Sequence, residues 1–394
     1  MPCRIPPLAR ERQARIVGRG DRRPTRHGPI AADGRGATRV EQRGGVPQET
    51  ASDPAHGDLA NAPSDVQTLL GTRISQLGLR LEGSPVERWI EQLYRELVRK
   101  GLGRFRPTCY LSDEWGCPSG EPVIGVPFYL ADPKLQAIER SLNDLEDERE
   151  ILMYLRHEAG HAFNYAYELY DTPEWIELFG PFDRPYVESY TPVPFSRRYV
   201  RHIAGWYAQK HPDEDFAETF AVWLTPRSNW RRKYAGWPAL RKLEYVDRVA
   251  RELARVEPKR ALSRALAELP VDEMTERLEE FYRRTVPDEA SNIADLVPDA
   301  ELEDIFDPGP ARDGFSPAAG LFSVHAKALV DKITYWTGIR RSLAKKLVEQ
   351  MGRRARELDL QVAAGRETQQ LIEVTVLATT LAMNYLQRGK FEER

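Results

Sequence analysis

The stretch from Asp144 to Leu169 constrains the fold of this chain more than any other, because it contains no proline and a single glycine. Apolar residues recur in it at helical spacing and predict one continuous apolar face: Ile151, Leu152, Leu155, Ala159, Ala162, Phe163 and Ala166. We therefore expect one long, well-packed helix. At the edge of its apolar face this helix carries the sequence His157-Glu158-Ala159-Gly160-His161.

The two histidines of this sequence are four residues apart, and positions i and i+4 share a face of a helix. His157 and His161 can therefore present two imidazole nitrogens to one metal ion. Glu158 lies one step around the helix, where it could reach a water at the metal without binding the metal itself. This H-E-x-x-H layout is typical of zinc hydrolases that use the glutamate as general base. Two half-buried histidines without a metal are the alternative.

A catalytic zinc usually has three protein ligands, so a third is expected elsewhere in the chain. A histidine six residues after His161 is excluded, because Tyr167 occupies that position and Asn164 occupies the place of the glycine that would precede it. The G-T-x-D pattern of aspartate-ligated zinc peptidases is absent as well. A third option is a glutamate on a later helix.

A later acidic segment offers such a glutamate. Pro212 marks the start of a predicted helix whose first turn is acidic, as the helix dipole favours. Glu214 and Glu218 lie four residues apart on one face of it. Glu214 could bind the metal while Glu218 accepts the outer N–H of a ligand histidine. Asp215 and Glu218 are alternative ligands, and a solvated acidic helix end is the alternative without a metal.

The motif and the later acidic pair together resemble a bacterial family of zinc-binding metallopeptidases. Tyr207, Trp115-Gly116 and the run from Val126 to Leu130 are further matches to this family. More distantly the pattern is similar to the anthrax lethal factor peptidase and the thermolysin-type gluzincins. The resemblance covers about residues 105–225 and implies an α+β, zincin-like domain that hydrolyses peptide bonds.

The resemblance also implies a role for each matching residue. Glu158 would be the general base, Glu218 would support a ligand histidine, and Tyr207, seven residues before the ligand glutamate, would stabilise the oxyanion. A place in the core is the alternative for Tyr207, and His202 and His211 are alternative donors or ligands. The ligands of one zinc ion would be His157, His161 and Glu214.

The remaining sequence predicts how the chain is organised. Residues 1–62 hold eleven arginines and no lysine, with many Gly and Pro residues. Such a segment cannot bury enough apolar surface to offset its ordering entropy, so we expect a disordered tail. The tail is either passive or a basic arm for an anionic partner. We expect the zincin-like domain over residues 63–250 and a mainly helical region over residues 251–394, interrupted by an acidic linker at about 288–318.

Periodicity and turn residues predict the elements around the motif. We expect a small sheet of two strands, which in zinc peptidases often offers an edge to an extended substrate. The predicted strands span residues 105–111 and 122–130. Helices are predicted over residues 66–81, 85–99, 197–209 and 214–224, a long loop over residues 170–194, and two or three helices over residues 324–388.

Composition limits the class of protein. The net charge of −3 disfavours bulk nucleic-acid binding, and no stretch is long and apolar enough to cross a membrane. Three cysteines cannot form a disulfide framework, although Cys109 and Cys117 could pair, so we expect a reducing, cytoplasmic location. The expected partner is a peptide or protein substrate. A zinc-containing binding protein without turnover and a nucleic-acid-associated protein are the alternatives.

Overall fold

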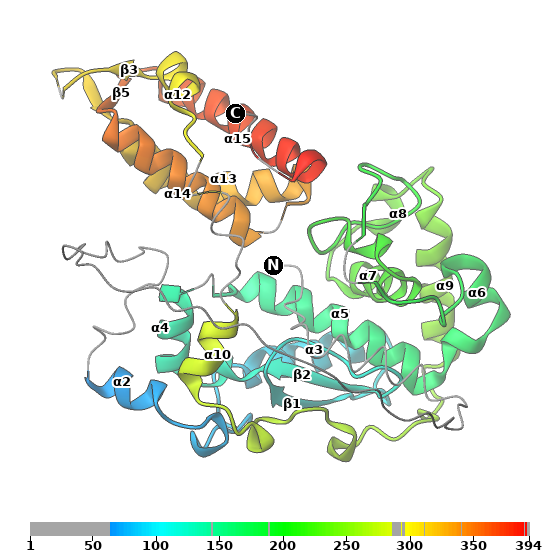
Figure 1. The fold of residues 1–394 in the computed structure, drawn as a ribbon. Coiled ribbons are helices and arrows are strands. Elements are labelled where there is room, and N and C mark those ends of the chain that lie inside the picture. The colour runs from blue at the N-terminus through cyan, green and yellow to red at the C-terminus, as the bar shows by residue number, and fades with distance from the viewer. Residues whose placement is uncertain are drawn as a thin grey trace, which may run out of the picture.

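Helices dominate the protein, and a small parallel sheet lies beside the longest helix of its N-terminal part (Figure 1). This mixture agrees with the predicted α+β class. The predicted tail over residues 1–62 lies outside the part that the structure describes. The computed structural model describes residues 64–142, 145–187, 190–285, 293, 296–310, 312–339, 341–389 and 391.

The motif helix is α5, Glu148–Tyr167, and it confirms the predicted long helix with slightly shorter bounds. Asp147 caps its N-terminus by accepting a hydrogen bond from the Glu150 backbone N–H at 3.0 Å. The Glu150 carboxylate accepts one from the Asp147 N–H at 3.0 Å, which completes a capping box. The helix ends where Glu168 adopts a left-handed conformation with φ 53°.

Two parallel strands pack against α5, at the places where strands were predicted. They are β1, Thr108–Ser112, and β2, Val123–Pro127, paired in register from Thr108↔Val123. The second strand is shorter than predicted because the chain turns into the 3-10 helix η3, Phe128–Ala131. The chain after β1 then pairs with the edge of β2 that faces away from β1, through an antiparallel bridge between Gly116 and Gly125.

The helix α3, Glu87–Arg99, is confirmed, but the helix predicted before it is too long. The structure has α2, Ser64–Leu70, followed by the short 3-10 helix η2, Ile74–Gln76. The helix cannot continue because the backbone N–H of Ile74 donates to Glu276, far along the chain, at 3.0 Å. Long-range backbone bonds thus replace the local ones that periodicity predicted.

The acidic segment forms α7, Pro212–Leu224, as predicted. It crosses α5 so closely at Gly160 that a Cβ there would lie 2.7 Å from the Cα of Ala217 and 2.9 Å from its carbonyl oxygen. Glycine inside the motif is therefore what allows the two site-bearing helices to approach each other.

The helix predicted over residues 197–209 is wrong, since only the 3-10 helix η5, Tyr207–Gln209, forms there. Gly205 and Trp206 both have left-handed φ angles, 85° and 51°, which no helix can contain. The backbone N–H of Ile203 donates to the carboxylate of Glu218 at 2.9 Å instead of to a helical carbonyl. The predicted loop over residues 170–194 is in part helical, because η4, Leu169–Asp171, and α6, Pro173–Phe179, bury Trp175 and Phe179.

A first hydrophobic cluster runs from Leu70 to Tyr282 and includes the sheet, α5 and α7. It extends beyond residue 250, and the division of the chain into domains stays a prediction. The remaining elements around it are α4, Pro133–Leu142; α8, Trp230–Lys233; α9, Ala239–Glu252; η6, Arg264–Leu266; η7, Val271–Glu273; and α10, Leu278–Thr285.

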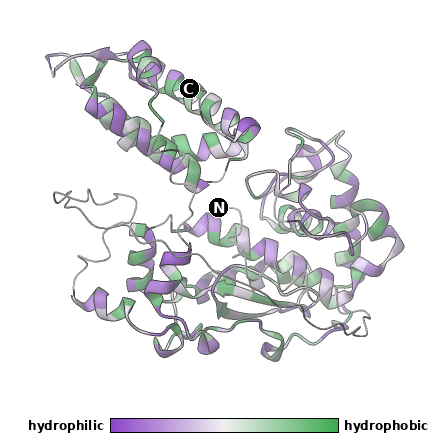
Figure 2. Ribbon diagram, in the orientation of Figure 1, coloured by the Kyte–Doolittle hydropathy of each residue, from purple (hydrophilic) through white to green (hydrophobic). Residues whose placement is uncertain are grey.

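A second hydrophobic cluster, Ile293 to Phe391, joins the C-terminal helices, which carry apolar residues among hydrophilic ones along each helix (Figure 2). Part of the predicted acidic linker packs into it, since Leu302 and Ile305 are buried. The predicted C-terminal helices are confirmed, and none in the described residues could span a membrane. The elements are α12, Asp299–Ile305; α13, Ala318–Thr337; α14, Arg341–Glu357; α15, Glu367–Arg388; and a small sheet in the order β3, Asp307–Pro308; β5, Leu360–Ala363; β4, Phe315–Pro317.

Candidate metal centre

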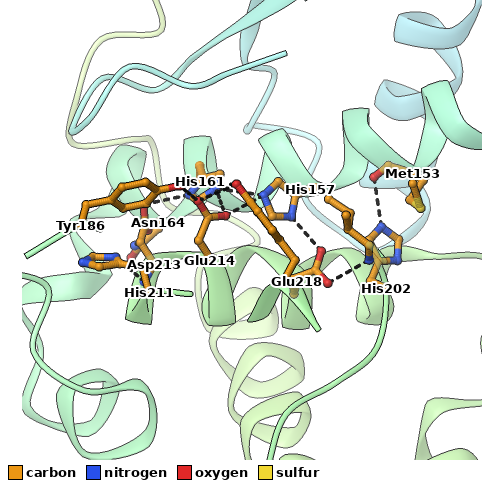
Figure 3. A network of polar contacts seen from close by, with 12 residues as sticks. Met153, His157, His161, Asn164, Tyr186, His202, His211, Asp213, Glu214 and Glu218 are labelled. Carbon is orange, nitrogen blue, oxygen red and sulfur yellow. Dashed lines mark hydrogen bonds and ion pairs between the residues drawn. The ribbon is translucent and has the colours of Figure 1, made fainter. Parts of the chain in front are cut away.

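Three predicted ligands meet between α5 and α7. The Nε2 atoms of His157 and His161 lie 3.1 Å apart, and both face Oε2 of Glu214, at 3.0 and 3.2 Å (Figure 3). All three side chains are buried, and each offers one ligand atom within 4.8 Å of the others. Together they form a buried group that could hold a metal ion.

The spacing of these atoms fits zinc. Bonds of about 2.0–2.1 Å in a tetrahedral site place neighbouring ligand atoms about 3.3 Å apart. The observed separations of 3.0 to 3.2 Å are close to that value. Two imidazole nitrogens and a carboxylate oxygen are also a donor set that zinc accepts. The chemistry and the geometry of the residues therefore both suit this ion.

The outer nitrogen of His157 is held by Glu218. His157 Nδ1 lies 2.9 Å from one carboxylate oxygen of Glu218, and the other oxygen accepts the Ile203 N–H. A hydrogen bond of this kind keeps the proton on Nδ1 and leaves Nε2 free to bind a metal. Glu218 thus lies where the sequence predicted it.

The outer nitrogen of His161 is held by Asp213, which sequence reasoning missed. Nδ1 lies 2.8 Å from Asp213 Oδ2, while Asn164 Nδ2 donates to Oδ1 at 2.8 Å. The Tyr165 hydroxyl donates to the same carboxylate. Asn164 follows His161 by three residues on the same side of α5, so its amide can reach the same carboxylate.

The second oxygen of Glu214 faces two tyrosines. The hydroxyls of Tyr186 and Tyr207 donate to Oε1 at 2.5 and 3.3 Å, and they lie 3.4 Å apart. Tyr207 was predicted at the site and is buried there, with its ring centroid 5.6 Å from that of His157. Tyr186 was not predicted, because it lies in an irregular segment where no spacing relates it to the motif.

The charges of the cluster stabilise one another. Burial alone would lower the pKa of His157, but its hydrogen bonds to Glu214 and Glu218 raise it to about 9. Burial would also lower the pKa of His161, but Asp213 and Glu214 outweigh this effect and hold the pKa well above its ordinary value. The two histidines in turn hold the pKa of Glu214 well below its ordinary value, against the effect of burial. Glu214 is therefore an anion at neutral pH.

The predicted general base, Glu158, is buried on α5 beside His157. Cys117 follows Gly116, which bridges to β2, and lies near Glu158. Burial, followed by the negative charges of Glu158 and Asp213, raises the pKa of the Cys117 thiol well above its usual range. Cys109 and Cys117 are not joined to each other and both remain free thiols.

The alternative site residues lie outside the ligand group. His202 Nε2 donates to the Met153 carbonyl at 3.0 Å, and His211 Nε2 donates to the Arg184 carbonyl at 2.8 Å. His211 caps α7 through its other nitrogen and is buried. Asp215 points away from the ligands and pairs with Lys242.

The comparisons with known proteins concern the same part of the molecule. No curated protein and no solved structure matches the chain. Residues 123–235 match the model of a family described as "Putative zinc-binding metallo-peptidase". This match contains β2, both ligand-bearing helices and the segment between them. It confirms the resemblance of the chain to that zinc-binding metallopeptidase family over residues 123–235.

Proposed function

We propose that the protein is a zinc-dependent peptidase of the H-E-x-x-H class with a glutamate as third ligand. The observation that supports this proposal best is the meeting of three buried ligand atoms beside a buried glutamate on the same helix. His157, His161 and Glu214 would hold one zinc ion. Glu158, next to the first ligand in the sequence, would act as general base.

A zinc ion bound there would supply Lewis acidity, lowering the pKa of a nearby water and polarising a peptide carbonyl. The carboxylate of Glu158 would take a proton from the attacking water and later pass it to the leaving amine. Tyr207 would donate its hydroxyl proton in a hydrogen bond to the oxygen of the carbonyl as negative charge develops there.

The outer carboxylates would prepare the two imidazoles for metal binding. Glu218 and Asp213 each accept the Nδ1 proton of one ligand histidine, at 2.9 and 2.8 Å. Each histidine then presents an unprotonated Nε2 to the metal, and the anions increase its basicity. The two pairs differ in what holds the carboxylate: a backbone N–H at Glu218, but side chains at Asp213.

The substrate would be a peptide or protein in an extended conformation. The segment that carries Gly116 and Cys117 borders β2 and lies close to Glu158. A peptide could add to this edge as a further strand, as β-augmentation requires. The free thiols of Cys109 and Cys117 support the cytoplasmic location predicted from the sequence.

Metal analysis and peptide cleavage by three variants test this function. Glu158→Gln should retain zinc and lose hydrolysis by a factor of about 10²–10⁴, the usual contribution of a general base. Glu214→Ala should lose most of the bound zinc. Glu148→Gln is the matched control, because Glu148 is exposed on the first turn of the same helix and should leave both properties unchanged.

Two outcomes would contradict the proposal. Full cleavage activity in Glu158→Gln would exclude the general base, and unchanged zinc content in Glu214→Ala would exclude the third ligand. Bound zinc with no cleavage of a broad peptide library by the wild-type protein would favour the alternative of a zinc-containing binding protein.

A further inference from the structure

The two oxygens of the Glu214 carboxylate lie in different surroundings. Oε2 faces the Nε2 atoms of both histidines, where a metal ion would bind. Oε1 points the other way and accepts hydrogen bonds from Tyr186 and Tyr207. A carboxylate oxygen can accept two hydrogen bonds, so both hydroxyls can bind Oε1 at the same time.

The two hydrogen bonds are unequal. The Tyr186 hydroxyl lies 2.5 Å from Oε1, within the range of about 2.5–2.7 Å for a strong bond to an anion. The Tyr207 hydroxyl lies 3.3 Å from the same oxygen, beyond the usual limit of about 3.0 Å for a hydroxyl donor. Glu214 is therefore held by Tyr186 far more strongly than by Tyr207.

We propose that Tyr186 is the positioning residue of Glu214. This inference rests on the proposed function and assigns separate roles to the two tyrosines at that site. Tyr186 would fix Oε1 so that Glu214 presents Oε2 alone to the metal. Tyr207, whose hydroxyl lies 3.3 Å from Oε1, keeps the role toward the substrate carbonyl that the proposed function gives it.

The surroundings of Tyr186 suit a fixed position. Its ring lies 5.2 Å from the ring of His211, and the Lys210 ammonium is 4.4 Å from its centroid. The same His211 donates to the Arg184 carbonyl two residues before Tyr186 and caps α7, the helix that carries Glu214. The start of α7 thus holds both the tyrosine and the carboxylate that it contacts.

Cobalt(II) binding tests the inference without any substrate. Cobalt in a site of this kind absorbs visible light, so a titration against a competing chelator gives the metal affinity of each variant. Tyr186→Phe should bind cobalt about 10–100-fold more weakly, as expected when an outer partner of a ligand is lost. Tyr207→Phe should bind it within about 3-fold of wild type and instead lose kcat on a cleaved peptide, with metal saturating.

Tyr190→Phe is the matched control. Tyr190 lies in the same segment as Tyr186, and its hydroxyl donates to the Gly205 carbonyl at 2.7 Å rather than to Glu214. Removing that hydroxyl perturbs the segment but leaves the carboxylate alone, so cobalt affinity should not change. An equal loss of affinity in Tyr190→Phe and Tyr186→Phe would mean that the segment, and not the Tyr186 hydroxyl, positions Glu214, and it would overturn the inference.

The other outcomes separate this inference from the proposed function. If the wild type binds cobalt and cleaves peptides, but Tyr186→Phe binds the metal normally, only the role of Tyr186 is refuted. A larger loss of affinity in Tyr207→Phe than in Tyr186→Phe would reverse the two roles and also refute it. If the wild type does not bind cobalt or zinc at all, the proposed metal site fails, and the inference fails with it.

Discussion

The two hydrophobic clusters bury different kinds of polar side chain. Buried ions fill the first cluster, among them the Arg156–Glu96 pair, the two ligand histidines and the acids of α7. Amides and hydroxyls dominate among the described residues of the second, whose one buried charged side chain, Arg341, pairs with Asp331 of its own region and with Glu150 of the first. The buried polar residues of the second cluster, among those described, are Thr334, Thr337, Arg341, Gln350, Gln361 and Gln370.

This difference supports the proposal that the first region carries the chemistry of the protein. Burying an ion costs several kcal/mol unless a partner compensates for it, so a core without a function rarely contains many. Clusters of coupled, buried ionisable groups are typical of functional sites. The first region therefore contains many buried ions around the candidate metal ligands, despite the desolvation cost of burying them. The second region has the interior of an ordinary helical unit.

The largest effect is expected from breaking the Arg156–Glu96 pair of the first region. Arg156 precedes the motif on α5 and donates to the Glu96 carboxylate of α3 through Nε and Nη2, at 2.7 and 2.8 Å. Glu96→Ala would leave a buried guanidinium without a partner and should lower the free energy of unfolding by about 3–5 kcal/mol. Urea denaturation followed by tryptophan fluorescence measures this, since seven of the eight tryptophans precede residue 240.

A buried amide of the second region provides the contrast. Gln370 Nε2 donates to the Ile305 carbonyl at 2.8 Å, so Gln370→Ala removes one neutral hydrogen bond. The expected cost is about 1–3 kcal/mol. If this variant lost as much stability as Glu96→Ala, the contrast between an ionic and a neutral interior would be wrong.

A smaller effect than that of Glu96→Ala is expected where α5 and α7 cross. Gly160→Ala would place a Cβ 2.7 Å from the Ala217 backbone, and overpacking of this kind costs about 1–3 kcal/mol. Since the proposed ligands come from both helices, zinc affinity should fall as well. Thermal unfolding and metal titration of the variant measure the two effects.

The second region again offers a matched variant. Gly320 also lies in a helix, α13, but a Cβ there would meet nothing within 4 Å. Gly320→Ala should therefore leave stability unchanged or raise it by up to about 1 kcal/mol. A stable, metal-binding Gly160→Ala protein would show that the helices can separate without harm to the site.

The sequence predicted the parts of this site that depend on local spacing. Helical periodicity was enough to relate His157 to His161 and Glu214 to Glu218, because each pair lies on one helix. Tyr186 could not be found in this way, since its contact with Glu214 joins an irregular segment to a helix.

The wrong helix over residues 197–209 has a related cause. Its apolar and aromatic residues suit a helix, but Gly205 and Trp206 adopt left-handed conformations, and the Ile203 amide is used by Glu218. The preference of this segment for a helix is overridden here by a contact of the site, the hydrogen bond from the Ile203 amide to Glu218. A chain segment that must supply a donor to a buried carboxylate thus loses the regular structure that its sequence favours.

The smallest effect is expected at the junction of the two regions. Lys327 of α13 donates to Asp147, the cap of α5, at 2.9 Å, but both side chains are largely exposed. Such a pair contributes at most about 1 kcal/mol, and Lys327→Ala should lower stability at neutral pH by no more than that. Lys332→Ala on the same helix is the control, because Lys332 is exposed and forms no ion pair with a described residue.

The pH dependence identifies this small effect. Partial burial raises the pKa of Asp147, but the hydrogen bonds from Lys327 and the Glu150 backbone outweigh it and lower the pKa below its ordinary value. A carboxyl with a lowered folded-state pKa stabilises the protein above its unfolded pKa, about 3.9, and loses this contribution as the pH falls through the folded value. The difference in stability between wild type and Lys327→Ala should therefore be full at pH 7, begin to decline near pH 3.9, and be lost once the pH has fallen through the lowered pKa of the folded state. A difference that stayed constant down to acid pH would mean that the Lys327 side chain joins the two regions by packing rather than by its charge.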